Sequence, residues 1–442
     1  MNTEESQQVL LFNEAEALIE SLRIFPIKSI GSSKWQKQHE YIEKLNMQAL
    51  LCASSQEEEF VKESLITLDK IPCLIADLIS TEVWKDKIFN IVLKTNFKPK
   101  TTIPVYMVLY HEATVVNLLE TVLFHKESLE SSGDNVLDLL DYCYRKLTSA
   151  VANNNREFLE KSKAAQNDGN SLEELCAQQD KMDFEIAVKV ISILRYLTDA
   201  LDCLPLSTPS RILNTHNIPC LLVELVEHPP WTRMEGGLTK KYIDGKWQEV
   251  SGPDVLQLTK VEGQVWLSLY NILMNVECVK KYDFNSFNKA QILKLRAHMT
   301  EVLLDQLPML ADLRRYLEEL SMTDSLAPER SLVLEQLPEI KERLLQENEG
   351  KWHAIAKHQM KHYFDPSQAE IQSQARRLAD TYNFDVMDSL LTDVPKCAVC
   401  GAEASKRCSR CRQEWYCKRE CQVSHWSKHK TVCDMMAGDM KP

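Results

Sequence analysis

The chain has 442 residues, of which 44% are hydrophobic and 26% are charged, and its formal net charge is −12. This length allows a sizeable buried core and predicts two or more domains. The acidic N-terminus lacks the order of a signal peptide, and no run approaches the roughly 18 apolar residues of a membrane span. These features argue against secreted and membrane-inserted proteins, and we expect a protein of the cytosol or nucleus.

The first 390 residues show the pattern of successive amphipathic helices. Apolar residues recur at i, i+3, i+4 and i+7 in long segments such as 184–204 and 290–320. Glycine is scarce, and none lies between Gly31 and Gly133. The sequence therefore predicts a mainly α fold for this part of the chain.

A weak internal repeat indicates how these helices assemble. The segments 70–79 ("KIPCLIADLI") and 217–226 ("NIPCLLVELV") carry apolar residues at the same offsets, and 102–110 is a fainter copy. Pro72 and Pro219 stand where a helix would begin, a position at which proline costs no hydrogen bond. Such helices resemble those of armadillo-type repeats, which predicts an armadillo-like α-solenoid. Because the copies are unevenly spaced, an irregular helical bundle remains the alternative.

A polar loop at 227–254 interrupts the helical pattern. Asp244-Gly245 supplies a tight turn between alternating residues and predicts a β-hairpin. Trp231 and Trp247 lie in this loop away from any helical stripe. They either form an exposed partner site or pack the loop back onto the helices.

The expected domain organisation follows these composition changes. A second polar break, at 152–171, predicts a flexible or frayed connection within the helical part. The predicted order is a helical scaffold domain at 1–390, a linker at 391–396, a small cysteine-rich domain at 397–433 and a tail at 434–442.

The domain at 397–433 contains eight potential metal ligands in four pairs and is predicted to be a zinc finger. Two pairs have the spacing C-x2-C, one C-x3-C and one H-x3-C. In a reducing compartment clustered cysteines seldom form disulfides, and eight sulfur and imidazole donors fill two closed, structural, tetrahedral zinc sites. The expected ligands are Cys397, Cys400, Cys408, Cys411, Cys417, Cys421, His429 and Cys433.

Helix geometry predicts how the pairs combine. Cys421 and His429 would lie about 12 Å apart along one helix, since each residue rises about 1.5 Å. We therefore expect an interleaved arrangement. Cys397, Cys400, Cys417 and Cys421 would share the first zinc, and Cys408, Cys411, His429 and Cys433 the second. His425 is the rival imidazole, but only His429 keeps the i,i+4 spacing to Cys433.

This ligand pattern resembles the MYND-type zinc finger, a protein-interaction module. In the corepressor members of that family, a Gln and a Trp that match Gln422 and Trp426 bind proline-containing peptides. On a helix, an exposed Trp four residues after a Gln offers a flat apolar face and an amide hydrogen-bonding group. The alternative is that Trp426 packs as the core of this small domain.

Nucleic-acid binding and catalysis are both poorly supported. The tail is basic, but bound thiolates would cancel part of this charge and the rest of the chain is acidic, so no phosphate-tracking surface is expected. The chain has no phosphate loop, dinucleotide fingerprint, H-E-x-x-H or G-x-S-x-G motif. It also lacks the glycine-rich turns of the methyltransferases in which some MYND fingers are embedded. We therefore expect no enzyme.

Over the whole chain the sequence resembles a family of MYND-finger factors that preassemble the dynein arms of motile cilia. That likeness implies a non-enzymatic cytoplasmic adaptor, concentrated near centrioles or the ciliary base. Its implied partners are chaperones, co-assembly factors including a leucine-rich-repeat protein, and dynein chains as clients. A nuclear corepressor-type adaptor is the alternative. The stretches that carry the likeness are 39–51, 103–127, 206–237, 263–273, 350–362 and 403–411.

Overall fold

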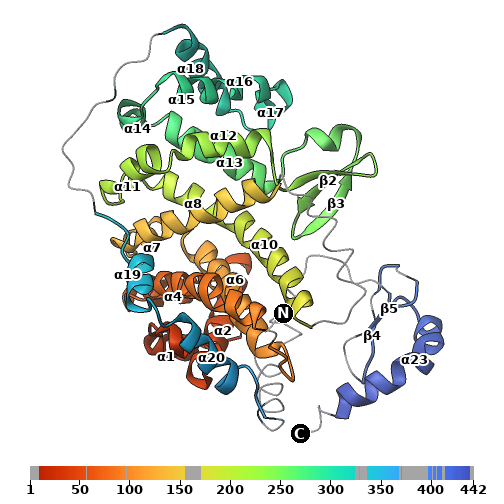
Figure 1. Ribbon diagram of the computed structural model, residues 1–442. Coiled ribbons are helices and arrows are strands. Elements are labelled where there is room, and N and C mark those ends of the chain that lie inside the picture. The colour runs from red at the N-terminus through yellow and green to blue at the C-terminus, as the bar shows by residue number, and fades with distance from the viewer. Residues whose placement is uncertain are drawn as a thin grey trace. The chain divides into compact units, whose positions relative to one another are not determined.

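The computed structural model describes most of the chain in two compact units, Met1–Thr381 and Tyr382–Pro442. The first unit is almost entirely helical, which confirms the predicted mainly α fold (Figure 1). No helix among the described residues is long and apolar enough to cross a membrane. The described residues are 9–55, 57–95, 97–154, 171–323, 328, 336–367, 370, 397–400, 402–404, 406–410 and 414–438.

The N-terminal helices form the first layers of this unit. They surround α4, in which every residue from Leu74 to Trp84 is buried. α4 packs against α6 and α8. These elements are α1 (Phe12–Ser21), η1 (Ile27–Ser29), α2 (Ser33–Ser55), α3 (Phe60–Thr67), α4 (Ile71–Trp84), η2 (Lys85–Phe89), α5 (Asn90–Lys94), α6 (Ile103–Val122), α7 (Lys126–Glu130) and α8 (Asn135–Asn154).

The second half of the unit continues the stack. α10 is the longest helix and contacts α6, α8 and α13, so it joins the two halves. These elements are α10 (Ser171–Asp199), α11 (Ser207–Ser210), η3 (Arg211–Thr215), α12 (Ile218–Glu227), η4 (Gly252–Leu256), α13 (Lys260–Leu273), α14 (Val276–Lys281), α15 (Ser286–Leu293), α16 (Leu295–His298), α17 (Glu301–Gln306) and α18 (Leu310–Met322).

All three Ile-Pro segments begin helices, namely α4, α6 and α12. Proline stands at the first turn in each, where its missing N–H leaves no intrahelical hydrogen bond unmade. In Figure 1 the helices up to α18 are layered broadly in chain order, whereas α19 and α20 lie beside the N-terminal helices. A regular armadillo-like repeat stays a prediction.

The loop at 227–254 forms a three-stranded antiparallel sheet of β1 (Thr232–Glu235), β2 (Leu238–Ile243) and β3 (Lys246–Val250). Asp244 and Gly245 have φ angles of 47° and 80°, as the predicted tight turn requires. Of the two alternatives for the tryptophans, the structure shows the inward one. Trp231 is only 2% exposed, and Trp247 stacks on Phe184 of α10.

The described chain then returns to its first layers. α19 (Ile340–Glu347) packs on α4, and α20 (Trp352–His362) packs on η1 and η2. Gln359 of α20 is fully buried, accepts a hydrogen bond from Trp84 Nε1 at 2.9 Å and donates to the Ile27 and Ile30 carbonyls. The α19–α20 segment therefore closes the core of the N-terminal layers.

Gly31 lies against the segment that follows α20, and we expect a substitution at this position to lower the stability of the protein. Its φ is +87°, and an added Cβ would lie 2.7 Å from Cε1 of the buried Phe364 ring. We expect Gly31→Ala to destabilise the protein by about 2 to 3 kcal/mol, because left-handed backbone strain and the clash add. Urea unfolding followed by circular dichroism measures this.

Gly133→Ala is the matched control for that measurement. Gly133 has a φ of +53°, but no atom lies within 4 Å of its added Cβ, so only the backbone term applies. Equal destabilisation by the two substitutions would contradict the packing of Phe364 on Gly31.

The predicted domain boundaries at 390 and 396, and most of the polar break at 152–171, lie outside the described residues. Within that range, α8 extends to Asn154 and α10 begins at Ser171. The boundaries therefore stay predictions.

Candidate metal centre in the C-terminal unit

The C-terminal unit is built on very little regular structure. Its described elements are β4 (Lys406–Arg407), β5 (Trp415–Tyr416) and α23 (Arg419–Gly438), shown at the blue end of the chain in Figure 1. β4 and β5 pair antiparallel, and the Ala398 N–H donates to the Trp415 carbonyl at 2.9 Å. A scaffold this small has little apolar surface to bury, so its stability must come from elsewhere.

The structure brings Cys397, Cys400, Cys417 and Cys421 together. Their sulfurs all lie within 4.8 Å of one another. The separation is 3.4 Å between Cys400 and Cys417, 3.7 Å between Cys417 and Cys421, and 4.0 Å between Cys421 and Cys400. These values match the edge of a tetrahedron of sulfurs about 2.3 Å from a zinc ion, which is about 3.8 Å. They are far longer than the roughly 2.05 Å of a disulfide.

A second cluster contains Cys408, His429 and Cys433. All three side chains are buried, with 1%, 4% and 0% exposure, and the two sulfurs lie 3.8 Å apart. Cys411, the predicted fourth ligand, lies outside the described residues. The described part of this cluster again fits a tetrahedral zinc site.

His425, the rival imidazole, lies in different surroundings. Its Nδ1 is 3.0 Å from the Tyr416 hydroxyl, and its ring stacks on that of His429 with centroids 5.7 Å apart. Neither metal-ligand cluster of the described finger residues includes it. The contact between the Tyr416 hydroxyl and His425 is a feature that the sequence analysis does not predict. The signal for it is that Tyr416 directly precedes the ligand Cys417.

The protonation of the first cluster differs from one sulfur to the next. Hydrogen bonds from the backbone, first among them that of Cys417, lower the pKa of Cys397 to about 6, which favours the thiolate form of this sulfur. Burial, followed by the neighbouring Cys417 thiol, raises the pKa of Cys421 to about 12. A zinc ion held by these four residues would supply a positive charge that favours the thiolate form of each.

Both predicted peptide-contacting residues lie on α23 and are half-buried. Trp426 packs against the buried residues of the finger, and its ring meets that of His429 edge to face with centroids 6.0 Å apart. Val423, on the same helix, is 66% exposed. Trp426 thus packs against the core of the finger and also keeps part of its surface accessible. Its role in binding a peptide stays a prediction.

Comparison with known protein families places this unit in a defined class. Residues 397–433 match the model of the MYND finger family. The finger of this class holds two structural zinc ions, in agreement with the two clusters.

Comparison with individual proteins extends the likeness to the whole chain. A Drosophila melanogaster protein, zinc finger MYND domain-containing protein 10 homolog, is 34% identical over 95% of this chain and 98% of its own length. Two other matches are short. Arabidopsis thaliana ubiquitin carboxyl-terminal hydrolase 19 is 45% identical over 10% of this chain and 7% of its own length. Mouse Tudor domain-containing protein 1 is 49% identical over 8% of this chain and 3% of its own length. No solved structure matches the chain.

Proposed function

Because the chain belongs to the family of zinc finger MYND domain-containing protein 10, we propose that it is a cytoplasmic adaptor for preassembly of the dynein arms of motile cilia. The whole-chain likeness supports the dynein-arm part of this proposal. The observation that carries the adaptor part is the finger itself, in which two ligand clusters hold α23 with Trp426 partly accessible.

Zinc has a structural role in this proposal. Cys397, Cys400, Cys417 and Cys421 would hold one ion, and Cys408, His429, Cys433 and the sequence-predicted Cys411 would hold the other. Each donor set is complete with four protein ligands, so neither ion would keep an open position for a substrate. The two sites would fix β5 and α23 in place and thereby present Gln422 and Trp426 to a partner.

The partners we propose are other proteins. They include chaperones, co-assembly factors such as a leucine-rich-repeat protein, and dynein chains as clients. The helical unit supplies a large folded surface, and the finger supplies a small, rigid one. A chain with two such parts can hold a client and an assembly factor at the same time, which raises the effective concentration of one for the other.

Trp426→Ala tests the role of the finger. We expect it to weaken binding of an extended, proline-containing partner segment by about 30-fold, equivalent to about 2 kcal/mol, because an accessible tryptophan at an interface centre is a typical hot spot. Zinc content should stay at two per chain, since Trp426 is not a ligand. Isothermal titration with the partner segment and zinc analysis by mass spectrometry measure the two quantities.

A cell assay connects this binding to dynein arms. In multiciliated cells that carry only Trp426→Ala, we expect outer and inner arms to be lost from axonemes while the variant remains in the cytoplasm. Val423→Ala also removes exposed apolar surface from α23, so it is the control for a general loss of such surface. Full partner affinity with two zinc ions in Trp426→Ala would place the binding surface elsewhere. Accumulation of the protein in the nucleus, with intact arms, would favour the corepressor-type alternative.

A further inference from the structure

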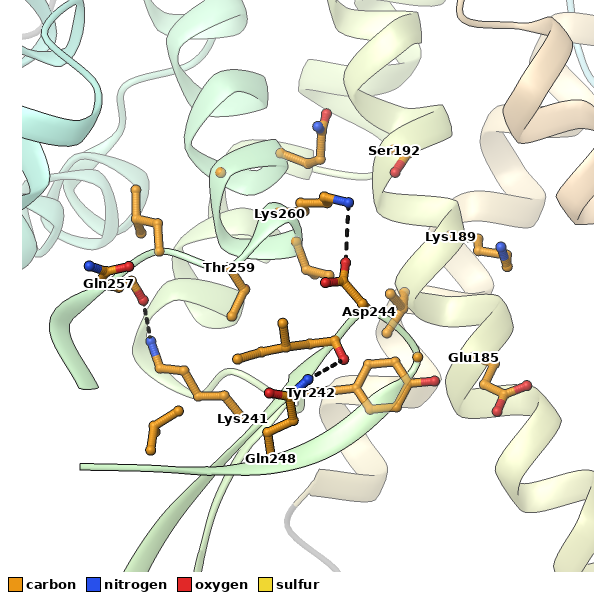
Figure 2. Close-up of a pocket in the computed structure, with 18 of the residues that line it drawn as sticks. Glu185, Lys189, Ser192, Lys241, Tyr242, Asp244, Gln248, Gln257, Thr259 and Lys260 are labelled. Carbon is orange, nitrogen blue, oxygen red and sulfur yellow. Dashed lines mark hydrogen bonds and ion pairs between the residues drawn. The ribbon is translucent and has the colours of Figure 1, made fainter. Parts of the chain in front are cut away.

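A groove in the helical unit lies between the β2–β3 hairpin, one side of α10 and the start of α13 (Figure 2). Its volume is about 1110 Å³, which exceeds the 300–1,000 Å³ of typical small-molecule pockets. Much of its wall is apolar. This part is formed by Val188, Tyr242, Val250, Leu258, Val261 and Leu267. The groove is thus large enough for several residues of a partner segment.

The lysines of this groove are already engaged by other groups. Lys189 of α10 pairs with Glu120 of α6 at 3.2 Å. Lys241 donates to the Gln257 carbonyl at 2.8 Å and pairs with Glu262. Lys260 pairs with Asp244 at 3.1 Å, and Figure 2 shows this pair and the Lys241 hydrogen bond. Little of the positive charge in the wall is left to attract an anion.

Carboxylates outnumber lysines in the lining of the groove by five to three, and several of them are exposed. Glu185 of α10 has 34% of its side chain exposed, and its partner Lys181 lies 3.7 Å away on the surface. Glu249 is 60% exposed and pairs with Lys240 at 3.4 Å. Asp254 also lines the groove and is exposed. Burial and then the charge of Glu185 raise the pKa of Tyr242 to about 12.

We propose that this groove binds a segment of a partner protein that carries lysine or arginine among apolar residues. Its cationic heads would pair with exposed carboxylates of the lining, among which are Glu185 and Asp254. The aliphatic stem and the neighbouring apolar side chains would pack on Tyr242, Val261 and Leu258, as long basic side chains commonly do. This surface belongs to the helical unit and is independent of the peptide site proposed for the finger.

A displayed library of random ten-residue peptides, panned against the full chain, tests the proposal. We expect a class of binders that carries Lys or Arg beside apolar residues. The double substitution Glu185→Gln and Asp254→Asn should weaken this class by about tenfold at low salt, because both carboxylates are replaced by amides of the same shape. Fluorescence anisotropy of the selected peptides measures the affinities.

Two controls separate the groove from other surfaces. Glu277→Gln removes an exposed carboxylate on α14 outside the groove and should leave the affinity unchanged. Peptides lost in Trp426→Ala but retained in the double variant belong to the finger, so failure of one proposal is distinct from failure of the other. The groove proposal is overturned if no peptide depends on Glu185 and Asp254, or if the dependent peptides are acidic or uncharged.

Discussion

Cys433→Ala is expected to cost the finger one zinc ion and, with it, most of its folded structure. The Cys433 side chain is fully buried, and its sulfur lies 3.8 Å from that of Cys408. Without it the second tetrahedral site has three ligands at most. Zinc contributes about 10–16 kcal/mol of binding free energy in small structural sites, and this is the free energy that folds them. The zinc content measured for the full chain should fall from two ions to one or none, and α23 should become sensitive to protease.

His425→Ala provides the matched comparison on the same helix. Its ring stacks on that of His429 but lies outside both ligand clusters of the described residues, so two zinc ions should remain. His429→Ala should behave like Cys433→Ala. Loss of zinc from His425→Ala, or two ions in Cys433→Ala, would contradict the ligand assignment. In each variant the helical unit should stay folded, since it has its own core.

Features set by nearby residues were predictable from the sequence. The Ile-Pro segments begin helices because proline at the first turn constrains φ locally, and Asp244-Gly245 turns the hairpin because both residues tolerate positive φ. Cysteine spacing predicted the interleaved clusters because the separation of ligands along a helix is fixed by its rise. The additional strand β1 was missed, although Gly236-Gly237 is the same kind of turn signal.

Features that depend on distant segments were not predictable in this way. Gln359 and Trp84 form a hydrogen bond across 275 positions of sequence, so no local pattern indicates that α20 returns to the N-terminal layers. Charged side chains in a helix normally predict a solvated face, but α6 is buried around most of its circumference, and Glu112 is one of its buried residues. Only the packed structure shows that partners from other elements reach this carboxylate.

Glu112→Ala is expected to have the largest effect on the helical unit. The Glu112 carboxylate is fully buried and contacts Lys85 Nζ and Lys146 Nζ, and it accepts a hydrogen bond from the Tyr142 hydroxyl at 2.8 Å. Asp183 also contacts Lys85. Removing Glu112 leaves Lys85 with Asp183 as a carboxylate contact and takes from Lys146 the buried carboxylate with which it pairs. We expect a loss of about 3 to 5 kcal/mol, as is typical when one partner of a buried ion pair is deleted, measured by urea unfolding.

The pH dependence of stability provides an independent check on the same group. Burial alone would raise the pKa of Glu112, but the charges and hydrogen bonds of Lys146 and Lys85 lower it from 4.5 to about 2. Because the folded-state pKa is depressed, the contribution of ionised Glu112 to the free energy of unfolding is fully present above pH 4.5. It is lost as the pH falls through 2. It amounts to about 3 kcal/mol. Glu112→Gln keeps the shape but cannot ionise, so its stability should fall less between pH 5 and pH 2 than that of the wild type. Equal acid dependence of the two proteins, or a cost below about 1 kcal/mol for Glu112→Ala, would show that the two lysines do not depend on this carboxylate.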